Sequence, residues 1–106
     1  MKFKLIITST NTKRNAQNIA NELLNNNISP CVQILTDAHP IYKWNNKIMT
    51  HKEHILLIKI PEGQKSACKE LLLKIHDYQV PEIIEIKGSI LNDKYSKWFL
   101  ENSNAL

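Results

Sequence analysis

The sequence predicts an α+β fold, in which an antiparallel sheet carries two amphipathic helices. Strand-like apolar runs alternate with two stretches of helical periodicity along the chain. An Asn-Asn pair separates two β-prone runs, which is typical of a tight hairpin between antiparallel strands. At 106 residues, we expect one domain covering 1–106.

The first strand and helix are predicted from the N-terminal third of the chain. Residues Lys2–Thr10 have a continuous apolar centre, Leu5–Ile7, which indicates a strand buried on both faces and hence central in its sheet. Thr12 or a neighbour can cap the following helix, and Asn25–Asn27 ends it. Its expected inward stripe is Ala16, Ile19, Ala20, Leu23 and Leu24.

Two further strands and a long third strand that runs back along them are predicted after Pro30. We expect strands at Cys31–Leu35 and Ile41–Trp44, with a kink or bulge at Pro40 between them. Asn45 and Asn46 should form the hairpin turn, because asparagine tolerates positive φ. The return is predicted as one strand over Lys47–Ile60.

The last third predicts a helix, a strand and a short helix. The helix spans about Gln64–His76, and its inward stripe is Ala67, Cys68, Leu71, Leu72 and Ile75. Pro81 separates it from a strand at Glu82–Lys87. A final helix is expected at Asp93–Asn102, with Asn92 or Asp93 as its cap and Tyr95, Trp98 and Phe99 on its apolar side.

The element order is therefore β-α-β-β-α-β with an extended hairpin and a C-terminal helix, the ferredoxin-like arrangement. Both main helices then cover one face of an antiparallel sheet. The other face is left bare, and we expect self-association to cover it.

Composition and charge argue against several classes of protein. The net charge of +4 comes from scattered lysines, and Arg14 is the only arginine, so no basic cluster for nucleic acid is evident. No apolar run approaches the ~18 residues of a membrane span, and Leu5–Ile7 is too short for a signal peptide. We therefore predict a cytoplasmic protein with no nucleic-acid or membrane partner, in which Cys31 and Cys68 are small hydrophobes rather than a disulfide.

Catalytic signatures are missing from the sequence. No G-x-S-x-G element occurs, and two glycines are too few for a phosphate-binding loop, so we predict that the protein is not an enzyme. His51 and His54 lie three apart on the predicted long strand and should face opposite ways, which excludes joint chelation. We expect them to be solvated or packed against the hairpin.

The stretch from His76 to Glu82 gathers polar groups around Pro81 and has two interpretations. A histidine at a helix C-terminus followed by turn-forming residues is a common structural ending. Alternatively, the imidazole, the Tyr78 phenol and a carboxylate converge in a pocket at a subunit edge. Such a pocket would suit Cu(II) or Zn(II).

Three blocks make the chain similar to the CutA family of divalent-cation tolerance proteins over nearly all of its length. Residues 28–34 resemble the family's L-A-A-C-V-N-I, residues 41–48 its I-Y-x-W-x-G-K-I, and residues 76–84 its H-P-Y-E-V-P-E-I-I. Residues 95–98 resemble its C-terminal Y-x-x-W. The resemblance implies a tight homotrimer knitted by the long hairpins, linked to tolerance of copper and other divalent cations. It also implies a likeness to PII-type signalling trimers, which bind effectors between subunits.

Four positions depart from the family's pattern. Asn46 replaces the turn glycine, and Asp77 replaces a proline. Thr8 stands where some members have a cysteine implicated in copper binding, and Ile75 where they have a histidine. A thiolate site for Cu(I) is therefore not expected in this chain.

The resemblance leaves two functions open. In the first, His76 and Glu82 bind copper or another divalent cation weakly in an inter-subunit cleft. In the second, the same cleft binds a small effector or a partner protein, and no cofactor is required. Alternatively, the Glu82 carboxylate would bind a lysine or a backbone amide across the trimer interface and would only stabilise the assembly. The other residues expected at the cleft or interface are Tyr78, Pro81, Trp44, Cys31 and Thr8.

Overall fold

Four antiparallel strands form the main sheet of the computed structural model, which describes residues 1–104. In sheet order they are β2 (Cys31–Ala38), β5 (Glu53–Ile60), β1 (Lys2–Thr10) and β6 (Ile84–Ser89). All three strand pairings are antiparallel. The predicted α+β class is confirmed, and so is the central place of β1, which pairs with both β5 and β6.

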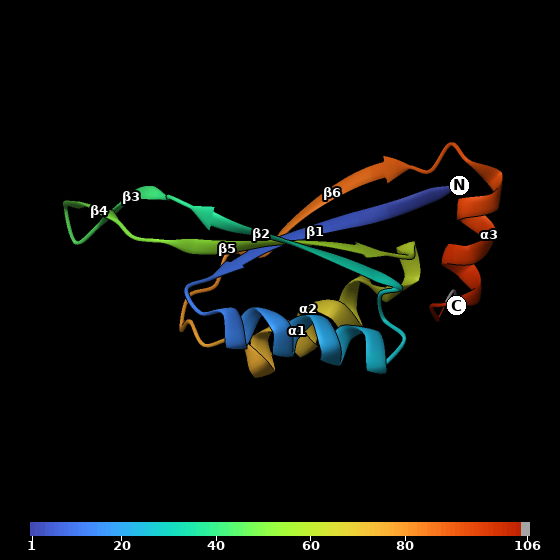
Figure 1. Ribbon diagram of the computed structural model, residues 1–106, viewed down its shortest axis with the longest axis horizontal. Coiled ribbons are helices and arrows are strands. Elements are labelled where there is room, and N and C mark those ends of the chain that lie inside the picture. Colours follow the sequence, from blue (N-terminus) through green and yellow to red (C-terminus); the bar gives the residue numbers. More distant parts are fainter. Residues whose placement is uncertain (105–106) are drawn as a thin grey trace.

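Helices α1 (Lys13–Asn25) and α2 (Lys65–Ile75) lie side by side on one face of this sheet (Figure 1). A 3-10 turn, Glu62–Gln64, leads into α2. The third helix, α3 (Asp93–Glu101), packs at the end of the sheet near the N-terminus (Figure 1). Among the described helices none is both long and apolar enough to cross a membrane.

A hairpin of β3 (Ile41–Trp44) and β4 (Lys47–Thr50) projects from the other end of the sheet (Figure 1). It gives the chain a long axis of 46 Å, against 25 and 21 Å for the other two. Asn45 and Asn46 turn the hairpin with φ of 52° and 62°. The prediction that asparagine supplies these positive angles is confirmed.

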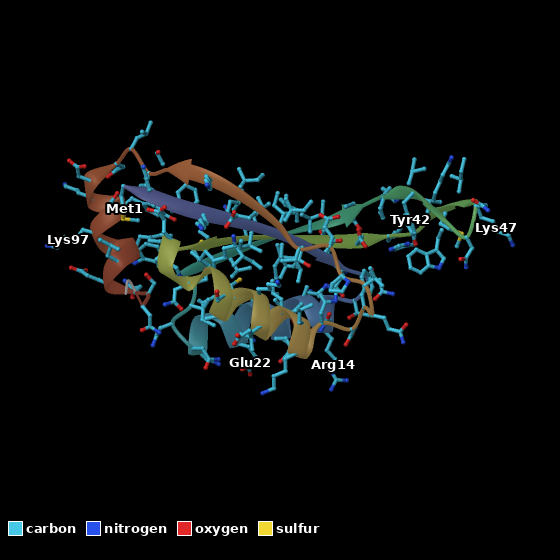
Figure 2. All side chains as sticks on the ribbon, turned by 180° about the vertical axis from the view of Figure 1, so that it is seen from behind. Met1, Arg14, Glu22, Tyr42, Lys47 and Lys97 are labelled. Carbon is cyan, nitrogen blue, oxygen red and sulfur yellow. The ribbon has the colours of Figure 1, made fainter. Side chains whose placement is uncertain are left out.

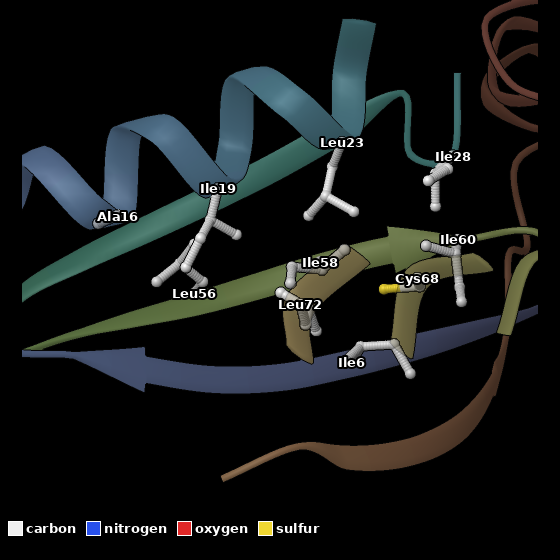
Figure 3. Close-up of a cluster of buried hydrophobic side chains, with 10 residues drawn as sticks. All are labelled: Ile6, Ala16, Ile19, Leu23, Ile28, Leu56, Ile58, Ile60, Cys68 and Leu72. Atoms are coloured by element: carbon white, nitrogen blue, oxygen red, sulfur yellow. The ribbon is translucent and has the colours of Figure 1, made fainter. Parts of the chain in front are cut away.

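The core forms where the two helical stripes meet the inward side of the sheet (Figure 3). Fully buried side chains from α1, β5 and α2 compose it: Ala16, Ile19, Leu23, Leu56, Ile58, Ile60, Cys68 and Leu72. Burial raises the pKa of the Cys68 thiol to about 12, so this cysteine packs as an apolar group. Leu24 was expected in the stripe but is 42% exposed, because a position one step beyond Leu23 turns about 100° away from the core.

Several predicted strand limits were wrong. The return strand is not continuous over Lys47–Ile60, because Thr50 ends β4 and Glu53 begins β5. Strand β2 was expected to end at Leu35 but extends to Ala38. Its irregularity lies between Leu35 and Ala38 rather than at Pro40, and Asp37 there has φ of 61°. A bulge increases the local twist of a strand. Beyond this irregularity, β3 and β4 form a two-stranded sheet that is separate from the main sheet. The last strand begins at Ile84 rather than at Glu82.

The sheet face opposite the helices is uncovered in a single chain. Strand side chains alternate between faces, so Leu5 and Ile7 point away from the helices while Ile6 and Thr8 are buried beneath them. Leu35, Ile84 and Ile86 are each about half exposed, at 51%, 46% and 46%. A contiguous apolar surface of this kind is typical of a region that contacts another protein.

Candidate functional site: a cleft at the base of the hairpin

A cavity of about 660 Å³ opens where the hairpin joins the sheet. The hairpin contributes Tyr42 and Trp44 to its wall, and the segment that returns to the sheet contributes His51 and Glu53. The turn after α2 closes the other side with residues 77–80 and 82. Figure 2 shows Tyr42 and Lys47 on the hairpin, at the opposite end of the molecule from Met1 and Lys97.

Glu53 is the most buried charged group in this cavity, with its side chain only 11% exposed. The Tyr78 hydroxyl donates a hydrogen bond to Glu53 Oε2 at 2.9 Å. Nε2 of His51 lies 3.3 Å from the same oxygen. A carboxylate removed from water needs such donors, so these two partners make its burial tolerable.

Tyr42 extends the cluster from Glu53 out to the hairpin. Its hydroxyl lies 3.2 Å from Nδ1 of His51, and the two rings meet edge to face with centroids 5.5 Å apart. His51 therefore packs against the hairpin, which confirms one of the two expectations for it. The result is a hydrogen-bonded chain from Tyr42 through His51 and Glu53 to Tyr78.

Tyr78 is held as a neutral phenol. Burial raises its pKa above the ordinary value, and the hydrogen bond to the Glu53 carboxylate adds to the effect. A tyrosine that keeps its proton remains a donor to the carboxylate. The pair is thus a fixed polar element in one side of the cavity.

His76 is not among the described residues that line the cavity, and it contacts the backbone of Tyr78 instead. Its Nε2 donates to the carbonyl oxygen of Ser9 at 2.9 Å, and its Nδ1 accepts from the Tyr78 backbone N–H at 3.0 Å. Because the carbonyl can only accept and the amide can only donate, the ring is the neutral Nε2–H tautomer. Burial lowers the pKa of His76, which also favours the neutral form.

Asn15 fixes the position of the turn that carries Tyr78. Its side chain is almost fully buried at the start of α1. Oδ1 accepts from the Thr10 hydroxyl at 2.9 Å and from the Asp77 N–H at 3.3 Å, while Nδ2 donates to the Ile75 carbonyl at 3.1 Å. One amide thus joins β1, α1 and the end of α2.

The structure brings together only some of the residues predicted for the site. Trp44, Tyr78 and Glu82 line the cavity, and Pro81 is half-buried next to Glu82. Cys31 begins β2 at the far end of the sheet from the hairpin (Figure 1). Thr8 is fully buried in β1, and its hydroxyl has no hydrogen-bond partner among residues 1–104.

The residues around His76 do not fit a metal centre within one chain. Both ring nitrogens of His76 already have partners, and no hydrogen bond or ion pair within the described part of the chain joins this ring to Glu82. No group of three or more His, Cys, Asp or Glu within residues 1–104 is arranged to hold a metal ion. A copper or zinc site of ordinary coordination number would need ligands from outside this chain.

Sequence reasoning missed Glu53, and with it the centre of the cluster. A glutamate in a strand is ordinarily solvent-exposed, so nothing local indicated its burial. It stands in the polar stretch Thr50–His54, directly before the apolar run Ile55–Ile58, and such a position ordinarily indicates a solvated strand end. Its main partner, Tyr78, is 25 residues away in sequence.

Comparison with known proteins gives a consistent result. The model of a family described as CutA1 divalent ion tolerance protein matches residues 4–102. The rice protein CutA 1, chloroplastic, is 32% identical over 101 residues, which are 93% of this chain and 55% of the rice protein. The divalent-cation tolerance protein CutA of Thermus thermophilus is 27% identical over 100 residues, covering 94% of this chain and 97% of that protein.

Solved structures agree with these sequence matches. The crystal structure of CutA1 from rice superimposes with a TM-score of 0.93 at 25% identity, over 98% of this chain and 95% of that one. The Thermus thermophilus structure gives 0.90 at 27% identity, over 98% and 100% of the two chains. The chain therefore spans about half of the rice chloroplastic protein and nearly all of the bacterial one.

Proposed function

Since this chain belongs to the CutA1 family of divalent ion tolerance proteins, we propose that it acts in tolerance of divalent cations as a homotrimeric ligand-binding protein. The name of the family describes a phenotype rather than a reaction, and we assign no catalytic step. The site is the cleft at the base of the hairpin. We propose the cytoplasm as its location, although the name of the rice relative describes that protein as chloroplastic.

The observation that carries the proposal is the buried Glu53 carboxylate, fixed by Tyr78 in the lining of a cavity of about 660 Å³. Ligand sites are typically concave, of roughly 300–1,000 Å³, with apolar walls and a few well-placed polar groups. Tyr42 and Trp44 supply such walls. Burying a carboxylate costs desolvation free energy. A cluster that served only to stabilise the fold could avoid this cost by using neutral side chains.

Self-association is supported by the surfaces left open in one chain. The strand order β2-β5-β1-β6, with both helices on one face, supports a ferredoxin-like fold. The bare face carries Leu35, Ile84 and Ile86, and the hairpin carries Ile41 and Ile48, each 75% exposed. A second and third copy would cover both regions and would turn the cavity into a cleft between subunits.

A PII-like role follows from this arrangement, because a small effector bound between subunits would report its concentration through the assembly. A thermal-shift screen of nucleotides, organic acids, amines and divalent metals tests it. We expect at least one ligand whose stabilisation persists in chelator. A monomeric, well-folded protein by light scattering at micromolar concentration would contradict the proposal, as would a screen without any stabilising compound.

Weak binding of copper or another divalent cation is the second candidate, and the carboxylates Glu53, Asp77 and Glu82 in one cavity favour it. Oxygen ligands with water suit a weak and unselective site. His76 could join only by giving up its bonds to Ser9 and Tyr78. Calorimetric titration of copper or zinc into wild type and a His76→Ala, Glu82→Gln double variant tests the contribution of these two residues, since identical curves would exclude both as ligands.

A further inference from the structure

We propose that the ligand of this cleft is an organic cation, an ammonium or guanidinium compound, rather than a metal ion or an anion. The inference rests on the proposed ligand-binding function and specifies the chemistry of the site. It is drawn from the charge and the aromatic content of the cavity wall.

The charge of the cavity is opposite to that of the protein. Its lining includes the carboxylates of Glu53, Asp77 and Glu82, and among residues 1–104 His51 is the one basic side chain that lines it. No lysine or arginine in the described part of the chain lines it, although the sequence has 14 of these residues against 10 acidic ones. A cleft lined by one sign of charge concentrates ions of the other sign and repels those of its own. An anionic effector would therefore be disfavoured here.

Aromatic rings make up much of the remaining wall. Tyr42, Trp44 and Tyr78 all line the cavity. Trp44 is 54% exposed, so its indole ring is accessible to a ligand. Cations are attracted to the faces of Trp and Tyr rings, and the attraction is stronger where water is excluded. Carboxylates combined with such rings are suited to an alkylammonium or guanidinium group.

The size and geometry of the site favour an organic cation over a metal ion. A cavity of about 660 Å³ is far larger than one coordination sphere. A metal requires several ligands converging on one point, and no such group occurs within residues 1–104. An organic cation spreads its charge over a larger surface and can be held by carboxylates that are not close together.

Glu53 also gives the site a fixed counter-charge. Tyr78 and His51 both lie within hydrogen-bond distance of its Oε2, which holds the carboxylate in place before a ligand arrives. Organisation of this kind reduces the entropy lost on binding. Glu82, which is exposed and also lines the cavity, would supply a second charge.

Three probes with one skeleton and different charges test the inference on the intact assembled protein. They are 2-phenylethylammonium, the neutral 2-phenylethanol and the anionic 3-phenylpropionate, each followed by protein-observed NMR titration. We expect the ammonium compound to bind roughly threefold or more tightly than the alcohol, and the carboxylate to bind most weakly. The shifted amides should map to residues 42–53 and 77–82.

Matched variants separate cation recognition from general effects on the fold. Trp44→Leu should weaken binding of the ammonium probe roughly threefold or more, whereas Trp98→Leu, on α3 and 41% exposed, should leave it unchanged. Glu82→Gln should reduce the preference for the ammonium compound over the alcohol. Glu62→Gln, at the start of the turn before α2, is its control. Both pairs lie at exposed positions, so the variants should fold.

Equal binding of the ammonium compound and the alcohol would overturn the inference, and so would tighter binding of the carboxylate. In either case a ligand would still occupy the cavity, so the proposed function would stand. Absence of any shift with all three probes would also overturn the inference. The thermal-shift screen and light scattering would then judge the proposed function independently.

Discussion

The Tyr78 hydroxyl donates a 2.9 Å hydrogen bond to the Glu53 carboxylate, linking the turn after α2 to the first residue of β5. This contact closes one side of the cavity and brings together segments that are distant in sequence. The effect of this contact is measurable, because Tyr78→Phe removes the hydroxyl and keeps the ring.

Tyr78→Phe should lower the free energy of unfolding by about 1–2 kcal/mol, because a largely buried carboxylate loses its shortest donor. The measurement is urea denaturation at a fixed protomer concentration. Tyr42→Phe is the matched control. That hydroxyl is at an exposed position, where water can replace it, so the change should be below about 0.5 kcal/mol. Equal effects of the two variants would contradict the role assigned to Glu53.

Asn15→Asp should destabilise the protein by about 1–3 kcal/mol, since a carboxylate cannot donate to the Ile75 carbonyl. It would also place a negative charge in a buried site close to Asp77. The same substitution at Asn18, on the exposed side of α1, is the control and should change stability little. Amide exchange should be faster at residues 76–79 in the Asn15 variant only, and unchanged exchange there would exclude Asn15 as the anchor of the turn.

Gly88→Ala should destabilise the protein by about 1–3 kcal/mol. A Cβ at this position would lie 2.7 Å from Cε1 of the Phe3 ring, which packs edge to face on Phe99 with centroids 6.2 Å apart. Phe3→Leu should remove much of the additional cost, so a double-mutant cycle would measure a favourable coupling. Additive effects of Gly88→Ala and Phe3→Leu would mean that the ring is not the obstacle.

His76 should make the protein less stable in mild acid. The folded state lowers its pKa below the ordinary value of 6.5, so the unfolded chain binds the proton more readily. The stabilising effect is present above pH 6.5 and is lost as the pH falls through the folded-state pKa. In His76→Gln the free energy of unfolding should fall less between neutral and mildly acidic pH than in wild type.

The other three histidines are present in both proteins, so the difference between the two curves isolates His76. Denaturant titrations at several pH values provide the measurement. Parallel curves for wild type and His76→Gln would show that protonation of this ring is not coupled to folding.

Much of the fold could be predicted because it depends on short-range periodicity. The inward stripes of α1 and α2, the limits of β1 and the turn at Asn45 and Asn46 all follow from patterns within a few residues. The break between β4 and β5 at His51–Lys52 could not be found in this way. The residues on either side of it have ordinary strand character, and the irregularity in β2 that accompanies the break lies on another strand.

The candidate site was predictable only in part. Trp44, Tyr78 and Glu82 were expected at the cleft and do line the cavity. His76 was expected to be a ligand; within this chain its two nitrogens bond to Ser9 and Tyr78, and the ligand role stays a prediction. The polar residues of the segment 76–82 indicated it as a candidate site, and most of that segment lines the cavity. The direction in which each side chain points depends on partners that no local pattern specifies.

The sequence by itself determined the order of the elements, the faces that helices and strands turn inward, and the family to which the chain belongs. Each of these is set by the spacing of residue types along the chain. Only the tertiary structure decided that Glu53 is buried and that His51 and Tyr78 are its partners, because hydrogen bonds between distant segments exist only after the sheet has brought those segments together.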